Sequence, residues 1–221
     1  IGAAAQVGTV LFEFLRKCLY GGVFIYIRYL VIAHFCRLIA AHRELTLIFL
    51  FFMLSTVCGS LANTTLLAMG DRDYLMIRIM LISPYMNFLG KLVYKIITDF
   101  VYFTIILAIY GVSFWHSLIL SFVTAMCRPI GEMLAIIMFD KIKSLYNNRG
   151  VYNGLVMALC IMAAYGFPLI ERRVSYDWMS VVHPLFAVMM FLLGAGASVF
   201  LWWYKYYRKI MREAMYIKRE M

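Results

Sequence analysis

Charged residues are scarce in this chain: Asp, Glu, Lys and Arg make up 14% of its 221 residues, whereas 65% are hydrophobic. Ordinary soluble domains carry about 25% charged residues, which keep their surface solvated. The composition therefore excludes an ordinary water-soluble protein. A chain of this length has room instead for about six apolar segments of about 20 residues, the length that crosses the hydrocarbon core of a bilayer.

Cysteine and histidine are too scattered to form an obvious site. The cysteines have no CxxC spacing and fall in or beside apolar runs, so we expect small hydrophobic side chains rather than disulfides or metal ligands. They are Cys18, Cys36, Cys58, Cys127 and Cys160. The histidines lie near the ends of apolar runs, where interfacial or helix-capping side chains are expected. They are His34, His42, His116 and His183.

Motifs for hydrolytic chemistry are missing as well. The chain contains no G-x-x-x-x-G-K-[ST], no HExxH and no G-x-S-x-G sequence, so no nucleotide-binding or peptidase motif is recognisable. Residues 1–10 lack an initiator Met and the features of a signal peptide, which indicates that some N-terminal sequence is missing. We expect a chain that is not itself an enzyme and that binds no cofactor or metal.

Long apolar runs dominate the rest of the sequence. They predict an all-α, polytopic membrane protein with six transmembrane helices. The predicted spans are residues 21–40, 45–69, 92–112, 117–139, 151–170 and 183–204. The domains that follow are an N-terminal segment with an interfacial elbow helix (1–20), a six-helix transmembrane domain (21–204) and a basic cytoplasmic tail (205–221).

The segment 9–20 is amphipathic, with Leu11, Phe14, Leu15 and Cys18 on one side and Glu13, Arg16 and Lys17 near the other. This pattern is typical of a helix that lies in the interface between lipid and water. We therefore predict that it lies flat on the membrane surface before the first span.

Lys and Arg are placed in the gaps between apolar runs, although the net charge is +10. Basic residues that bind nucleic acid would cluster on a soluble face among exposed aromatics, so no nucleic acid partner is expected. With the tail inside, 15 of the 21 Lys and Arg residues lie on the cytoplasmic side, four lie outside and two lie within spans. The positive-inside rule thus predicts that both termini are cytoplasmic.

Two charged residues sit in the middle of the span at 117–139. Arg128 and Glu132 are four residues apart and can pair on one helix face. Pro129 and Gly131, which lie between them, are expected to bend the helix. An ionisable group at this depth is costly and faces a partner or a cavity. The pair therefore either lines a substrate path or fastens this span to a neighbour.

Arg28 and Asp99 are lone charges in two other predicted spans. Each either lines the same path or extends its charged end to the membrane surface. The residues proposed for a substrate path or for helix pairing are accordingly Arg28, Asp99, Arg128 and Glu132.

The segment 71–91 interrupts the apolar pattern. It contains a predicted charged helix at 71–82, a Ser83-Pro84 turn and Gly90-Lys91 at the mouth of the next span. This order resembles the permease subunits of ABC-2-type exporters. In that family an elbow helix precedes six spans, both termini are cytoplasmic, and the loop between spans two and three forms a coupling helix that docks on an ATPase subunit.

The resemblance implies a permease subunit of an ATP-driven exporter in a bacterial cell membrane, moving an amphipathic or hydrophobic substrate such as a peptide or a lipid-like molecule. ATP and Mg would bind in a partner ABC ATPase, and a second permease copy would complete a homodimer or heterodimer. The residues expected to contact the ATPase lie in the segment 71–82 and the loop 140–150. They are Asp71, Arg72, Asp73, Tyr74, Arg78, Lys141 and Lys143.

The sequence also departs from that family. Only residues 171–182 separate the last two predicted spans, whereas many members carry a longer external segment there. An alternative hypothesis is an ion channel or ion-coupled secondary transporter whose path is formed by Arg28, Asp99, Arg128 and Glu132. Ion flux through lipid vesicles without an ATPase would favour this alternative.

Overall fold

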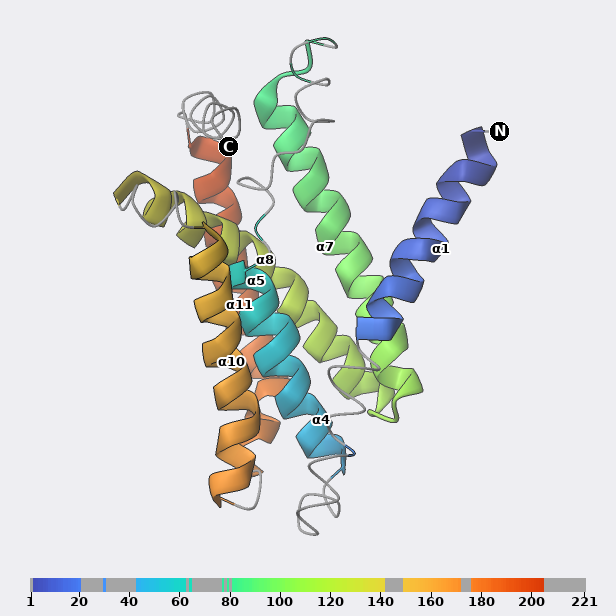
Figure 1. Cartoon of the computed structure of the whole chain (residues 1–221), viewed down its shortest axis with the longest axis vertical. Coiled ribbons are helices and arrows are strands. Elements are labelled where there is room, and N and C mark those ends of the chain that lie inside the picture. Colours follow the sequence, from blue (N-terminus) through green and yellow to red (C-terminus); the bar gives the residue numbers. More distant parts are fainter. Residues whose placement is uncertain are drawn as a thin grey trace.

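The computed structural model describes residues 2–20, 43–62, 81–141, 149–171 and 176–204, with the single residues 30, 64, 77 and 79. Every regular element in these ranges is a helix (Figure 1). In chain order they are α1 (Gly2–Tyr20), α4 (Arg43–Phe51), the π-helix η2 (Phe52–Cys58), α5 (Gly59–Ala62), α7 (Pro84–Ile109), α8 (Phe114–Lys141), α10 (Arg149–Glu171), the 3₁₀-helix η3 (Tyr176–Val182) and α11 (Pro184–Trp203). The all-α prediction is confirmed for this part of the chain.

Four helical stretches are long and apolar enough to cross a bilayer. They are Glu44–Ala62, Pro84–Ile109, Phe114–Met138 and Pro184–Trp203. The first of them joins α4, η2 and α5 end to end, and the apolar stretch described within α10 (Arg149–Glu171) is Gly150–Gly166. The described residues thus hold four candidate spans; the tail at 205–221 and, apart from Leu30, the predicted span at 21–40 lie outside them.

The outer face of α11 is apolar. Leu185, Leu192, Trp202 and Trp203 each have more than half of their surface exposed. A face of this kind is unfavourable in water and favourable in hydrocarbon, which is the expected pattern for a helix on the lipid side of a bundle. The described helices are therefore those of a membrane-integral protein.

The first candidate span forms the core of the described bundle. Leu47, Ile48, Leu50 and Phe51 of α4 are almost completely buried, in a cluster that also contains side chains of α7 and α8. The Phe51 ring packs edge to face on Phe103 of α7, with 5.1 Å between ring centroids. Since lipid tails are as apolar as these side chains, close packing rather than escape from water holds such helices together.

α8 packs closely against two neighbours. A methyl group on Gly131 would overlap the backbone carbonyl oxygen of Ser60 in α5, and one on Gly194 of α11 would lie 2.9 Å from the carbonyl oxygen of Met126. Small residues at such crossings let helix backbones approach each other in membranes. Gly131 and Gly194 therefore fix α8 between α5 and α11.

Pro129 bends α8 without ending it. The helix is continuous from Phe114 to Lys141, and its olive C-terminal part turns away from its yellow-green N-terminal part (Figure 1). A proline inside a helix removes one backbone hydrogen bond and produces a kink of this kind. The predicted bend is therefore present.

α7 begins eight residues earlier than the predicted span at 92–112. It runs without interruption from Pro84 to Ile109. The Ser83 side chain caps it by accepting a hydrogen bond from the Met86 backbone N–H at 3.4 Å. Proline suits the first helical position, because its missing N–H would have no partner there. Ser83-Pro84 is thus the start of the span itself, and Gly90-Lys91 lies inside the helix.

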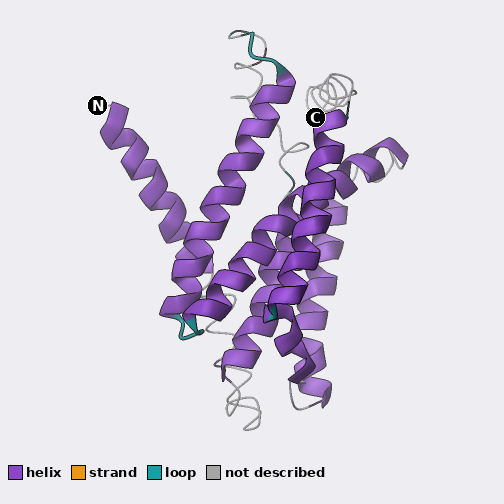
Figure 2. Cartoon of the chain, turned by 180° about the vertical axis from the view of Figure 1, so that it is seen from behind, coloured by secondary structure: helices purple, strands orange, loops and turns teal. Residues whose placement is uncertain are grey.

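α1 runs at an angle to α7 and approaches it at one end, so that the two helices form a V (Figure 2). The Tyr102 hydroxyl donates to the Val10 carbonyl oxygen at 3.4 Å, and the Tyr110 hydroxyl donates to the Cys18 carbonyl oxygen at 3.0 Å. These tyrosines belong to the second half of α7 and its C-cap. These bonds join the middle and the end of α1 to this part of α7, and the interfacial elbow helix stays a prediction.

α1 turns its charged side toward α7. Its apolar residues Leu11 and Leu15 are more than half exposed, whereas Glu13 and Lys17 are mostly buried against α7. Charged side chains in an apolar environment pair with protein partners in this way.

Candidate functional site

Six charged residues of three helices meet beside the middle of α7, and we call them the charge cluster. They are Glu13 and Lys17 of α1, Lys95 and Asp99 of α7, and Arg128 and Glu132 of α8. Three are acidic and three are basic, so their formal charges cancel. An apolar environment requires this balance, because an uncompensated buried ion is very costly.

Asp99 is the centre of the charge cluster. Its carboxylate is 1% exposed and has a cation at each oxygen. The Arg128 Nε donates to Oδ2 at 2.7 Å, and the Lys17 Nζ lies 2.8 Å from Oδ1. One buried acid therefore connects α7 to both α1 and α8.

Arg128 also connects α8 to the first candidate span. Its Nη1 donates to the carbonyl oxygen of Gly59 at 2.7 Å. Gly59 directly follows the π-helix η2, and π-helical turns are frequent at functional sites. Because the guanidinium is planar and carries several N–H groups, it binds an acid and a carbonyl at once. This residue thus joins three of the described helical segments.

Lys17 has further partners on α1 and α7. Its ammonium lies 3.4 Å from Glu13, one turn back on the same helix. It also lies 4.7 Å and 5.8 Å from the ring centroids of Tyr102 and Phe103, and an aromatic face attracts a cation most strongly where water is excluded. The Tyr94 hydroxyl donates to Glu13 at 3.1 Å. Its charged side therefore holds α1 against α7.

Glu132 and Lys95 complete the charge cluster. Glu132 is 2% exposed and follows Arg128 by one turn of α8. Lys95 is partly buried, precedes Asp99 by one turn of α7, and interacts electrostatically with both acids. The second half of the charge cluster thus lies nearer the start of α7, where Lys91 is exposed.

The structure brings together three of the four intramembrane charges that the sequence singles out. Asp99 is not a lone charge that extends to a surface, because it is buried and paired. Arg128 forms an ion pair with Asp99 on the neighbouring helix α7, so it fastens α8 to a neighbour as one of the two hypotheses predicts. Arg28 lies outside the described residues.

The residues expected to contact an ATPase are mostly outside the described ranges. Lys141 is the last residue of α8, and its side chain is not described. The others fall entirely outside: Asp71, Arg72, Asp73, Tyr74, Arg78 and Lys143. Their role stays a prediction.

Sequence reasoning missed Glu13, Lys17 and Lys95 as members of a site. The pairs Glu13–Lys17 and Lys95–Asp99 are each separated by four residues, which places their side chains on one helix face. This four-residue spacing of opposite charges is the sequence pattern that could have indicated the site. The amphipathic pattern of α1 does not itself show that its charged side faces α7.

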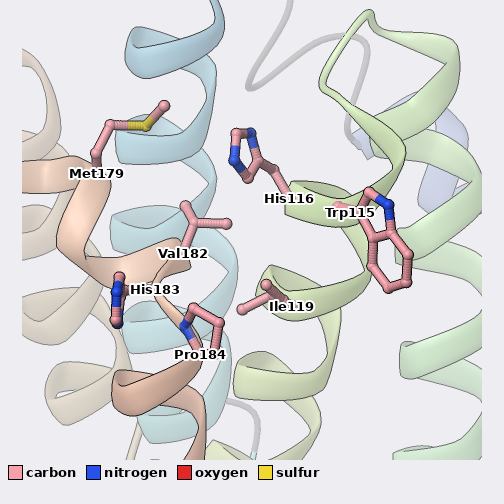
Figure 3. Close-up of a pocket in the computed structure, with 7 residues that line it drawn as sticks. All are labelled: Trp115, His116, Ile119, Met179, Val182, His183 and Pro184. Carbon is pink, nitrogen blue, oxygen red and sulfur yellow. The ribbon is translucent and has the colours of Figure 1, made fainter.

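A pocket of about 400 Å³ lies where α8 and α11 begin (Figure 3). Its lining comes from the first turns of α8, from η3 and from the start of α11. The lining residues are Trp115, His116, Ile119, Met179, Val182, His183 and Pro184. Apart from the two imidazoles and the indole N–H, these side chains are apolar.

The two histidines of the pocket have defined partners. The Nδ1 of His116 lies 2.7 Å from a carboxylate oxygen of Glu44, which also accepts a hydrogen bond from the Ser113 backbone N–H at 2.9 Å. The Nδ1 of His183 accepts a hydrogen bond from the Leu185 backbone N–H at 3.3 Å and caps α11. The capping role predicted for histidines near span ends is thus confirmed for His183.

Comparison with family models, with curated proteins and with solved structures gave no match. Within the described ranges, no group of three or more His, Cys, Asp or Glu side chains is arranged to hold a metal ion. The site is therefore interpreted from its own geometry.

Proposed function

We propose that the chain is the transmembrane permease subunit of an ATP-driven exporter, powered by a separate ABC ATPase. The observation that carries this proposal is the course of α7. This helix starts at Pro84, directly after the segment expected to dock on the ATPase, and leads without a break to Asp99. A single rigid element thus joins the docking segment to the charge cluster.

The dimensions of α7 suit such a role. Its 26 residues correspond to about 39 Å at 1.5 Å per residue. Ion pairs from Asp99 to Lys17 and Arg128 fasten it to α1 and α8, so a push on its first turn moves these helices together. Rigid-body tilting of helices is a common means of opening one side of a transporter while closing the other.

The substrate in this proposal is amphipathic or hydrophobic, either a peptide or a lipid-like molecule. The exposed faces of the described helices are rich in Leu, Met and aromatic side chains, which suit such a molecule better than a sugar. A second permease copy, identical or different, would complete the transporter in a bacterial cell membrane.

Charge reversal in the docking segment tests the proposal. Arg72→Glu and Arg78→Glu should abolish the stimulation of ATPase activity by the permease, because contacts between charged surfaces discriminate strongly against like charges. The partner ATPase is identified by co-purification, and its activity is measured in lipid vesicles with and without the permease.

Lys218→Glu in the basic tail is the matched control, since it makes the same change of charge outside the docking segment. It should leave the stimulation intact. Co-purification without an ABC ATPase, or normal stimulation of the enzyme by both docking-segment variants, would reject the exporter role.

A further inference from the structure

The buried polar residues of α8 lie on a single face of the helix, which we call the α8 polar face. Its members are Ser117, Ser121, Thr124, Arg128 and Glu132, and all are buried. Successive members are three or four residues apart, the spacing that keeps side chains on one side of an α-helix. From the first member to the last, this face extends about 22 Å, most of the roughly 30 Å hydrocarbon core.

The first candidate span packs on the α8 polar face with polar groups of its own. The Thr124 and Thr56 hydroxyl oxygens are 2.7 Å apart, and the Gly59 carbonyl oxygen accepts from Arg128 at 2.7 Å. Small hydroxyl residues also occur at ordinary helix interfaces in membranes, where they hydrogen-bond across helices. Buried ions such as Arg128 and Glu132 are costly there and mark a path or a site.

Ser121 distinguishes the α8 polar face from an ordinary hydrogen-bonded interface. The hydroxyls of Ser117 and Thr124 donate to the backbone carbonyls of Val112 and Leu120. The Ser121 hydroxyl is fully buried, and it has no hydrogen-bonding partner in the part of the chain that the structure describes. A buried hydroxyl in this state calls for an explanation, such as a water molecule that donates to it and accepts from it.

Both ends of the α8 polar face lead to titratable groups near a surface. At one end, Ser117 follows His116, which is partly exposed, lines the pocket of Figure 3 and pairs with Glu44. At the other end, Glu132 interacts with Lys95, one turn from the exposed Lys91. The polar line therefore reaches a partly exposed side chain on each side of the bundle.

We propose that the α8 polar face is a path for protons between His116 and Lys95. Hydroxyl groups both accept and donate protons, so the face can relay them, together with entering water, without room for a larger solute. Close packing at Gly131 and Ser60 excludes such solutes. The Arg128 charge by itself would repel protons and metal cations alike, and the paired Asp99 carboxylate offsets it.

The transfer at the inner end conserves charge. A proton that reaches the Glu132 carboxylate neutralises it, and the Lys95 ammonium then loses its counter-charge and releases a proton toward the exposed end of α7. The neutral amine afterwards takes the proton from Glu132, which restores the starting state. Asp99 and Arg128 face this exchange from α7 and α8, and Glu13 and Lys17 complete the charged surroundings from α1.

Proton flux through vesicles tests this path. The purified full chain is placed in phosphatidylcholine and phosphatidylglycerol vesicles that contain a pH-sensitive dye, and a potassium gradient with valinomycin sets the membrane potential. Wild type should acidify the lumen about tenfold faster than protein-free vesicles, and Glu132→Gln should remove this excess rate. No ATPase is present, so the result does not depend on the exporter role.

Ser121→Ala is the decisive variant, because its hydroxyl has no partner to lose among the described residues and the fold should be unaffected. It should lower the excess rate by about tenfold. Ser198→Ala, which removes a hydroxyl that donates to the Gly194 carbonyl of α11, should leave the rate unchanged. The path is rejected if wild type acidifies vesicles no faster than lipid alone, or if Ser121→Ala and Glu132→Gln both conduct like wild type.

Discussion

Single residues in this bundle are held by charge balance more than by hydrophobic burial. Asp99 faces two cations on two different helices, and the acids and bases around it are equal in number. In a lipid environment, the loss of any one of them changes the net charge of a buried site. The change in the free energy of unfolding on substitution therefore depends on the net charge that remains in the charge cluster.

Asp99→Leu should be strongly destabilising, by about 3–5 kcal/mol, because it leaves a buried cation without compensation. The free energy of unfolding is measured by titrating the protein in mixed micelles with sodium dodecyl sulfate. Asp99→Leu/Arg128→Leu removes one charge of each sign and should recover part of this loss. A double variant that is as unstable as the sum of its two single variants would contradict the role of charge balance.

At the level of helices, close backbone contact controls how α5 and α8 meet. Gly131→Ala should cost about 1–3 kcal/mol, because the new methyl group overlaps the Ser60 carbonyl and forces the helices apart. The gain in helix propensity is smaller than this cost. Thermal unfolding in detergent, followed by tryptophan fluorescence, measures the effect.

Gly196→Ala in α11 is the matched control for this contact, since a methyl group there would meet no atom within 4 Å. It should leave the unfolding temperature unchanged or raise it slightly through helix propensity. Equal destabilisation by both substitutions would argue against the tight crossing of α5 and α8.

The helices themselves follow from the length of the apolar runs. The stretches Glu44–Ala62, Phe114–Met138 and Pro184–Trp203 lie close to their predicted positions, because about 20 apolar residues have few other stable arrangements. The start of α7 was harder to locate, since proline both ends one helix and begins another. Only the cap from Ser83 to Met86, a contact in space, decides between these roles.

The charge cluster depends on contacts that local spacing does not contain. The sequence identifies Arg128 and Glu132 as charges within one predicted span. The partner of Arg128, Asp99, is 29 residues away along the chain. Which faces of α7 and α8 meet is decided by packing, for example at Gly131. The contacts of α1 were missed for the same reason, because its amphipathic pattern does not name the helix that its charged side faces.

For the molecule as a whole, the charge cluster is where the proposed functions converge. α7 links it to the segment expected to dock on an ATPase, and the α8 polar face links it to the pocket beside His116. Both ideas require that α1, α7 and α8 meet inside the bundle rather than that α1 lies on the membrane surface. The central claim is therefore that the Lys17 side chain is buried beside Asp99.

Thiol labelling at position 17 tests this claim most directly. In a cysteine-free background, Lys17→Cys and Lys91→Cys are exposed in intact vesicles, permeabilised to reach both sides, to a charged maleimide that does not enter lipid. Lys17 is 13% exposed whereas Lys91 lies at the surface, so position 91 should react rapidly and position 17 should stay unlabelled until the protein is denatured. Equal labelling of the two positions would contradict the account and return α1 to the membrane surface.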